Sequence, residues 1–217
     1  MKVLAFNGSP RKEWNTAILL NKALKGAASK GAETELIHLY DLNYKGCISC
    51  FACKKKDGKS YGKCAVRDGL TPILSKIEEA DGIILGSPVY FGTASAEMRA
   101  FMERLLYPYI VYDAIPSVHI KKRANTGFIY TMGATESQMK ELGYEQHFKF
   151  NEMFMELVFG SCETLVVTDT YQFDDYSRYV ATLFDVNEKE RRRKEVFPID
   201  CKKALEMGAR IAQQSNI

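Results

Sequence analysis

Short apolar runs alternate along the chain with segments whose apolar residues recur every three or four positions. The runs at 2–6 (KVLAF) and 82–86 (GIILG) are nearly continuous in apolar residues, which is typical of parallel strands covered on both faces. Helical spacing begins at about Thr16, where apolar residues fall at i, i+3, i+4, i+7 and i+8. The pattern therefore predicts alternating strands and helices.

Five strands are expected from this pattern, each separated from the next by a helix. They are 2–6, 33–39, 82–86, 126–131 and 164–168. Parallel strands need long crossover connections, so the alternation predicts an α/β protein with an open parallel sheet and helices on both faces. Ligands of such sheets bind beyond the carboxyl ends of the strands, which directs attention to the loops that follow them.

The composition limits the number of domains and the kinds of partner, but it does not indicate a function. The 217 residues suit a single domain over 1–217, with a cysteine-containing insertion at about 44–66 and an irregular segment at about 171–199. The net charge of +3 is too balanced to favour a nucleic-acid partner. We see neither a signal peptide nor a membrane-spanning stretch, so a cytoplasmic location is the default expectation.

The loop after the first strand, 8–16 (GSPRKEWNT), leads into a helix N-terminus, where N–H groups and the helix dipole favour anions. Ser9, Asn15 and Thr16 offer hydroxyl and amide donors, and Arg11 offers a charged one. The dinucleotide and P-loop glycine motifs are absent, so the loop suits one terminal phosphate better than a pyrophosphate. The alternative is a polar turn in which Thr16 is the helix N-cap.

The loop expected at 87–95 follows the most apolar strand. Pro88 stiffens the backbone, and Gly92 lets the backbone approach a ligand closely. Tyr90 and Phe91 offer aromatic rings against which a planar ligand could lie. A strand-to-helix turn with core aromatic residues is the alternative reading of the same residues.

A third loop, 131–135 (TMGAT), follows the fourth strand and again suits close backbone approach. In a parallel sheet the three loops end at one edge. Their convergence is a stronger indication of a ligand site than any loop alone.

The motifs GSPR…NT at 8–16 and SPVYFG…SA at 87–96 resemble the NADPH-dependent FMN reductase family of the flavodoxin-like superfamily. The resemblance implies a flavodoxin-like three-layer α/β/α sandwich with a five-stranded parallel sheet of order 2-1-3-4-5. It also implies FMN as cofactor, NADPH or NADH as co-substrate, and a homodimer or homotetramer. The implied activity passes electrons from a reduced nicotinamide through flavin to a small acceptor: a quinone, a nitro or azo compound, a metal ion or free flavin.

The resemblance further implies the residues that hold FMN. The phosphate would lie on Ser9, Arg11, Asn15 and Thr16; the ring would lie against Pro88, Val89, Tyr90, Phe91 and Gly92; and Thr131, Met132 and Gly133 would close the other side. The flavin carries the redox chemistry, so no catalytic side chain is expected.

Cys47, Cys50 and Cys53 form a C-x2-C-x2-C run, and Cys64 follows it. Compact runs of this kind hold 4Fe–4S clusters, and the segment resembles the cysteine motif of iron–sulfur flavoproteins. In that group the last spacing is usually shorter than the spacer 54–63 found here. We therefore expect no metal at these cysteines.

The alternative is a cluster on all four thiols, which would make the chain an iron–sulfur flavoprotein or a flavodoxin-like electron carrier. In either case we expect the cysteines on one excursion between the second strand and the second helix, on the flavin side of the sheet.

Overall fold

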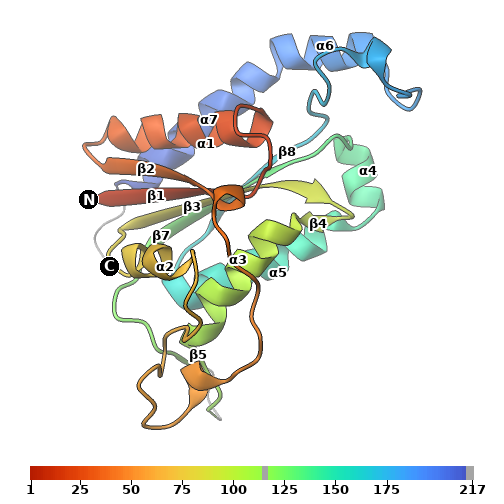
Figure 1. Cartoon of the computed structure of the whole chain (residues 1–217). Helices are drawn as coiled ribbons and strands as arrows, with labels where there is room; N and C mark the ends of the chain where they lie inside the picture. The colour runs from red at the N-terminus through yellow and green to blue at the C-terminus, as the bar shows by residue number, and fades with distance from the viewer. Residues whose placement is uncertain (114–116, 214–217) are drawn as a thin grey trace.

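The computed structural model describes residues 1–113 and 117–213 and has a central sheet between two layers of helices (Figure 1). Five parallel strands run in the order β2-β1-β3-β7-β8, which confirms the expected order 2-1-3-4-5. The strands are β1 (Lys2–Asn7), β2 (Glu33–His38), β3 (Gly82–Tyr90), β7 (Asn125–Thr131) and β8 (Glu163–Val167).

Helices cover both faces of this sheet. In Figure 1, α1 and α7 lie above the sheet, and α2, α3 and α5 lie below it. Their bounds are α1 (Asn15–Ala28), α7 (Phe197–Ile211), α2 (Thr71–Ile77), α3 (Ala96–Leu106) and α5 (Tyr144–Phe159). Successive residues of β1 point to opposite faces: Val3 and Ala5 pack in the α1/α7 core, whereas Leu4 and Phe6 pack in the other core. Among the described residues, no helix combines the length and the apolar character needed to cross a bilayer.

Strand β3 is longer than the sequence predicted. It runs on to Tyr90 and turns back through Phe91 and Gly92 into β4 (Thr93–Ala94), a sixth, antiparallel strand of the sheet. Pairing with β4 satisfies the backbone groups of the extended strand, so the segment expected to be a loop from Ser87 is mostly a hairpin.

The expectation of an irregular segment over 171–199 is wrong for its second half. Residues 171–185 contain one short 3₁₀ turn, η4 (Tyr176–Arg178), but α6 (Val186–Glu195) follows and α7 begins at Phe197. The Asp185 carboxylate caps α6 by accepting from two backbone N–H groups. Because α6 buries little besides Lys189, it has no apolar stripe by which a sequence pattern could be recognised.

Two further helices differ from the expectations drawn from the sequence. The short helix α4 (Glu136–Glu141) was not predicted, and a capping box between Thr135 and Gln138 starts it. Helix α5 is the helix expected between the fourth and fifth strands. Its pattern of apolar residues includes Phe150, Met153, Phe154 and Leu157, which are exposed, whereas Phe148, Met155 and Phe159 face the core.

The cysteine-containing segment leaves the sheet after η1 (Leu39–Asp41). It makes the short turn η2 (Ala52–Lys54) and lies below the sheet near η3 (Tyr107–Tyr109), β5 (Ile110–Val111) and β6 (Ser117–Val118) (Figure 1). The expected excursion between the second strand and the second helix is therefore confirmed.

Candidate functional site

The three loops at the carboxyl edge of the sheet are joined by hydrogen bonds. The Gly8 amide donates to the Gly86 carbonyl (2.8 Å), and the Ser95 hydroxyl donates to the Gly8 carbonyl (2.6 Å). The hydroxyls of Thr16 and Thr131 share a hydrogen bond of 2.8 Å. The first loop therefore contacts the ends of both β3 and β7, so the structure brings the predicted loops together.

Ser9 shapes the first loop from inside. Its buried hydroxyl accepts the Arg11 amide N–H, and its own amide donates to the Asn7 side chain. The N-cap of α1 is Trp14 rather than Thr16, and it offers no capping side chain. Because the first turn also lacks an acidic residue, the positive end of the α1 dipole is uncompensated there.

Three donors of the first loop converge on one segment after β8. Arg11 donates to the Gln172 carbonyl (2.6 Å), and Asn15 Nδ2 donates to the Tyr171 carbonyl (2.8 Å). The Trp14 indole N–H also donates to the Tyr171 carbonyl (3.1 Å). The donor set thus faces oxygen acceptors at one place, which is the arrangement that a phosphate group requires.

The β3–β4 hairpin presents aromatic rings to solvent. Tyr90 is exposed, and Phe91 is fully exposed (104%) with φ of 50°, a left-handed conformation that is costly for a bulky residue. Gly92 also has positive φ (80°), and a Cβ there would lie 3.0 Å from the Tyr144 ring. Pro88 and Val89 are half-buried in the strand. A large ring held exposed at a cost is typical of a ligand-binding surface.

The third loop is held in place by backbone bonds. Thr131 and Met132 are buried and Gly133 is half-buried. The Met132 amide donates to the Val167 carbonyl, and its carbonyl accepts both the amide and the hydroxyl of Thr170. The loop is therefore fixed against the end of β8.

Lys189 of α6, which the sequence did not single out, also holds this loop. Its buried ammonium donates to the Gly133 carbonyl (2.8 Å) and pairs with Asp169. The surrounding sequence EKERRRKE indicates a solvated face, and no spacing in it separates Lys189 from its neighbours. Only the tertiary fold shows its role.

Arg193, one turn further along α6, reaches the first loop. Its guanidinium donates to Asn15 Oδ1 (2.9 Å) and stacks 4.2 Å from the centre of the Phe197 ring. Burial lowers the pKa of Arg193, and the charges of Cys201 and Tyr171 oppose that shift. From the sequence, Arg191 to Arg193 are either part of a solvated face or receivers of the extra phosphate of NADPH. The contact of Arg193 with the first loop has no signal in the sequence.

Three of the four clustered cysteines lie on one tightly turning loop. Cys47 and Cys50 are exposed and Cys53 is buried. Burial raises the pKa of Cys53, the charge of Lys54 opposes the shift, and the charges of Cys47 and Cys50 add to it. The loop turns through left-handed backbone at positions 49 (φ 53°) and 51 (φ 54°), a geometry that gathers N–H groups around anions and iron–sulfur sites.

The fourth thiol is held elsewhere. Cys64 Sγ accepts from Arg104 Nε at 2.9 Å. Within the ranges that the structure describes, no group of three or more His, Cys, Asp or Glu side chains is arranged to hold a metal ion. The donor set suits an iron–sulfur cluster in kind, but the four thiols are not gathered.

The expectation that the cysteines lie on the flavin side of the sheet is wrong. The Cys47 amide is bound by Glu103, and the Lys54 ammonium donates to the carbonyls of Tyr107 and Ile110, beyond the C-terminal end of α3. These contacts draw the segment along α3, away from the carboxyl edge where that helix begins.

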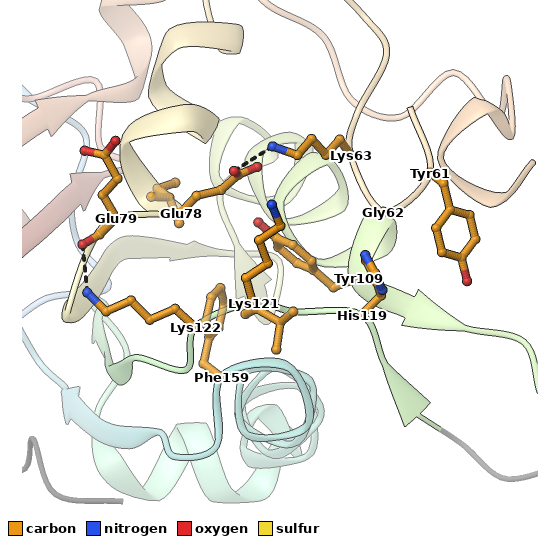
Figure 2. A pocket seen from close by; sticks show the side chains of 12 residues that line it. Tyr61, Gly62, Lys63, Glu78, Glu79, Tyr109, His119, Lys121, Lys122 and Phe159 are labelled. Carbon is orange, nitrogen blue, oxygen red and sulfur yellow. Dashed lines mark hydrogen bonds and ion pairs between the residues drawn. The ribbon is translucent and has the colours of Figure 1, made fainter. Parts of the chain in front are cut away.

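A separate cavity of about 180 Å³ lies beyond the C-terminal end of α3 (Figure 2). The edge-to-face ring pair Tyr109–Phe159 lines it, and Figure 2 shows Lys63 paired with Glu78 at its rim. Its volume is near that of an engineered cavity of about 150 Å³ that holds benzene, so it is too small for a flavin. It contains none of the predicted site residues.

Comparison of the sequence with known families gives a match over residues 1–157 to the family described as NADPH-dependent FMN reductase. An iron–sulfur flavoprotein of Methanocaldococcus jannaschii is 49% identical over 104 residues, 48% of this chain and 51% of that protein. One from Archaeoglobus fulgidus is 39% identical over 104 residues, 48% of each chain. The match thus spans about half the length of these curated relatives.

Solved structures share the fold across almost the whole chain. An NAD(P)H:quinone oxidoreductase from Methanothermobacter marburgensis has a TM-score of 0.66 at 15% identity, covering 100% of this chain and 99% of that one. An azoreductase from Bacillus anthracis has a TM-score of 0.68 at 16% identity, covering 97% and 99%. These identities establish the flavodoxin-like architecture and nothing finer.

Proposed function

Because the chain belongs to the NADPH-dependent FMN reductase family, we propose that it binds FMN at the carboxyl edge of its sheet as an oxidoreductase. Electrons would pass from NADPH or NADH to a small acceptor. One observation carries this proposal: donors from Arg11, Trp14 and Asn15 converge beside an uncapped helix N-terminus. Bound FMN would supply the redox chemistry, while this chain binds and orients it. We further propose that residues 1–217 act as one FMN-binding domain.

The residues of the three loops would divide the work of binding. Ser9, Arg11, Asn15 and Thr16 would hold the phosphate; Pro88, Val89, Tyr90, Phe91 and Gly92 would lie against the ring; and Thr131, Met132 and Gly133 would close its other side. The phosphate would replace the carbonyls that the first-loop donors now face, so the segment at 171–172 must yield when FMN binds. The exposed Phe91 ring would be covered.

We propose a planar acceptor from the aromatic character of the hairpin. A flavin ring held against Tyr90 and Phe91 would itself offer a flat aromatic face, which favours planar acceptors such as quinones, nitro compounds or azo compounds over metal ions. The structural neighbours named as quinone oxidoreductase and azoreductase support the same class.

Two measurements test the proposal. The cofactor is extracted from the purified protein and identified by chromatography; we expect FMN, and FAD or no flavin after reconstitution would overturn the assignment. NADPH and NADH are then mixed anaerobically with the flavin-loaded protein, and we expect one of them to bleach the visible flavin band. If only dithionite does so, the chain is an electron carrier and not a reductase.

A second candidate function is that of an iron–sulfur flavoprotein. The curated relatives carry that name, and Cys47, Cys50 and Cys53 share a loop whose left-handed turns suit a cluster. A cluster on all four thiols would require Cys64 to turn away from Arg104. Our expectation remains that the cysteines hold no metal in protein isolated in air. Iron and acid-labile sulfide assays on anaerobic protein decide, since a cluster gives about four irons per chain.

An apolar stripe on α5 supports the proposed homodimer or homotetramer. It consists of Phe150, Met153, Phe154 and Leu157, all exposed. Phe150 and Phe154 also line a hollow of about 610 Å³ that reaches Cys47. A contiguous row of exposed apolar side chains is typical of subunit contacts. Sedimentation of Phe150→Glu, with Leu142→Glu as an exposed control outside the stripe, tests it: only the former should shift the protein towards monomer.

A further inference from the structure

We propose that Arg193, on helix α6, is a positioning residue of the phosphate site and makes the site prefer FMN over riboflavin. The inference rests on the FMN function proposed above. The family match ends at residue 157, so this residue belongs to a part of the chain that the match does not cover.

The position of Arg193 is fixed from two sides. One guanidinium nitrogen lies 2.9 Å from Asn15 Oδ1, across 178 residues of sequence. The guanidinium plane also stacks on the Phe197 ring at the start of α7. The side chain therefore holds its charge beside the first loop.

The charge of Arg193 is not compensated by an acid. Its neighbours on α6 are paired, Arg191 with Glu188 and Arg192 with Asp200. In the part of the chain that the structure describes, no carboxylate forms an ion pair with Arg193 or with Arg11. Removing a guanidinium partly from water without an anionic partner is unfavourable, and burial accordingly lowers the pKa of Arg193. A phosphate at the first loop would supply the missing charge.

Arg193 also decides which end of the Asn15 amide faces the loop. An amide has an accepting oxygen and a donating nitrogen, and Arg193 can bind only the oxygen. The Nδ2 group is consequently turned towards Tyr171, where it donates at 2.8 Å. Arg11 donates to the next carbonyl along that segment, at Gln172. An incoming phosphate monoester would thus meet two donors already aimed at one place.

Riboflavin lacks this phosphate, which gives a test that separates positioning from general stability. Dissociation constants for FMN and riboflavin are measured on flavin-depleted full-length protein, for wild type, Arg193→Met and Arg193→Lys. Arg191→Met, an exposed neighbour on the same helix, is the matched control. We expect Arg193→Met to weaken FMN binding by about 10- to 100-fold, the range for a lost hydrogen bond to a charged group. Riboflavin binding should change by less than about twofold, which is within ordinary surface effects.

Arg193→Lys keeps the charge without the planar fork, so its FMN affinity should fall between those of wild type and Arg193→Met. Arg191→Met should match wild type. Circular dichroism of each flavin-free variant confirms folding; if Arg193→Met does not fold, the same ratio is read from Arg193→Lys.

The outcomes distinguish the two proposals. If wild type prefers FMN but the preference survives in Arg193→Met, or if both ligands weaken equally, the role of Arg193 is overturned while the FMN function stands. If wild type binds riboflavin as tightly as FMN, the phosphate site itself fails, and the proposed function fails with it.

Discussion

The buried Arg104 and the half-buried Arg193 differ in how many of their N–H donors are hydrogen-bonded. Arg104, at 1% exposure, has all five N–H donors bound: to both oxygens of Asp68, to the carbonyls of Lys45 and Val66, and to Cys64 Sγ. Arg193 contacts one amide oxygen and one ring and has no acidic partner among the described residues. An arginine whose donors are all hydrogen-bonded within the protein stabilises the fold. An arginine without an acidic partner marks a place where an anion is expected to bind.

The electrostatics of the Arg104 pair support the first half of this contrast. Burial pushes the pKa of Asp68 upward, but hydrogen bonds from Arg104 and its charge outweigh burial and lower the pKa overall. The pair therefore stays ionised near neutral pH and needs no ligand.

The largest expected effect is on the free energy of unfolding when Arg104 is replaced. Arg104→Met should lower the free energy of unfolding by about 3–5 kcal/mol, because Asp68 is left as a partly buried charge without its partner. Urea denaturation measures it. Arg99→Met, an exposed position on the same helix, should change stability by less than about 0.5 kcal/mol. Similar losses in both variants would show that Arg104 does not stabilise the fold in this way.

The next effect belongs to the carboxyl edge. Arg11→Ala should weaken FMN binding by about 1–3 kcal/mol, since a charge-assisted hydrogen bond is lost, and should leave the stability of the flavin-free protein nearly unchanged. A flavin titration measures the first quantity. An unchanged dissociation constant would remove Arg11 from the site.

A smaller effect is expected on the pH dependence of stability, through Asp68. The pKa of Asp68 is lower in the folded protein than its ordinary value, so this carboxylate stabilises the fold above its unfolded pKa of about 3.9. That contribution is lost as pH falls through the folded pKa. We expect the stability difference between wild type and Asp68→Asn to shrink below about pH 4 in acid titrations followed by circular dichroism. A constant difference would contradict the ion pair.

The smallest effect compares two strained rings. Phe51 in the cysteine segment (φ 54°) and Phe91 at the carboxyl edge (φ 50°) are both left-handed and exposed. Glycine at either position should stabilise the flavin-free protein by up to about 1 kcal/mol by relieving that strain. Only Phe91→Gly should also weaken flavin binding. Equal effects on flavin would abolish the functional distinction between the two regions.

The sequence predicted the sheet well because its central strands β1, β3 and β7 are buried on both faces. The apolar runs at 2–6 and 82–86 leave little alternative to parallel strands, and their order is confirmed. The meeting of the three loops could also be predicted, since it follows from topology alone. What each of their residues binds remains a prediction.

The features that the sequence did not predict share a physical cause. Lys189 and Arg193 act through tertiary contacts from a helix that has almost no buried face, so no periodicity reveals them. The extension of β3 to Tyr90 depends on pairing with β4, and the path of the cysteines depends on contacts with α3. Long-range pairing of this kind leaves no local pattern in a single sequence.

The hydrogen bonds of Arg104 to both ends of the cysteine-containing segment affect how such a chain can change in evolution. One side chain holds the Lys45 carbonyl where the chain enters the excursion, and it holds Cys64 Sγ and the Val66 carbonyl where the chain returns. These contacts close the base of the excursion whatever residues lie between positions 47 and 63. The entropic cost of a longer loop rises only slowly with its length. The stretch from 47 to 63 can therefore change in length, and its three thiols can be replaced, while the sheet and its carboxyl edge stay unchanged.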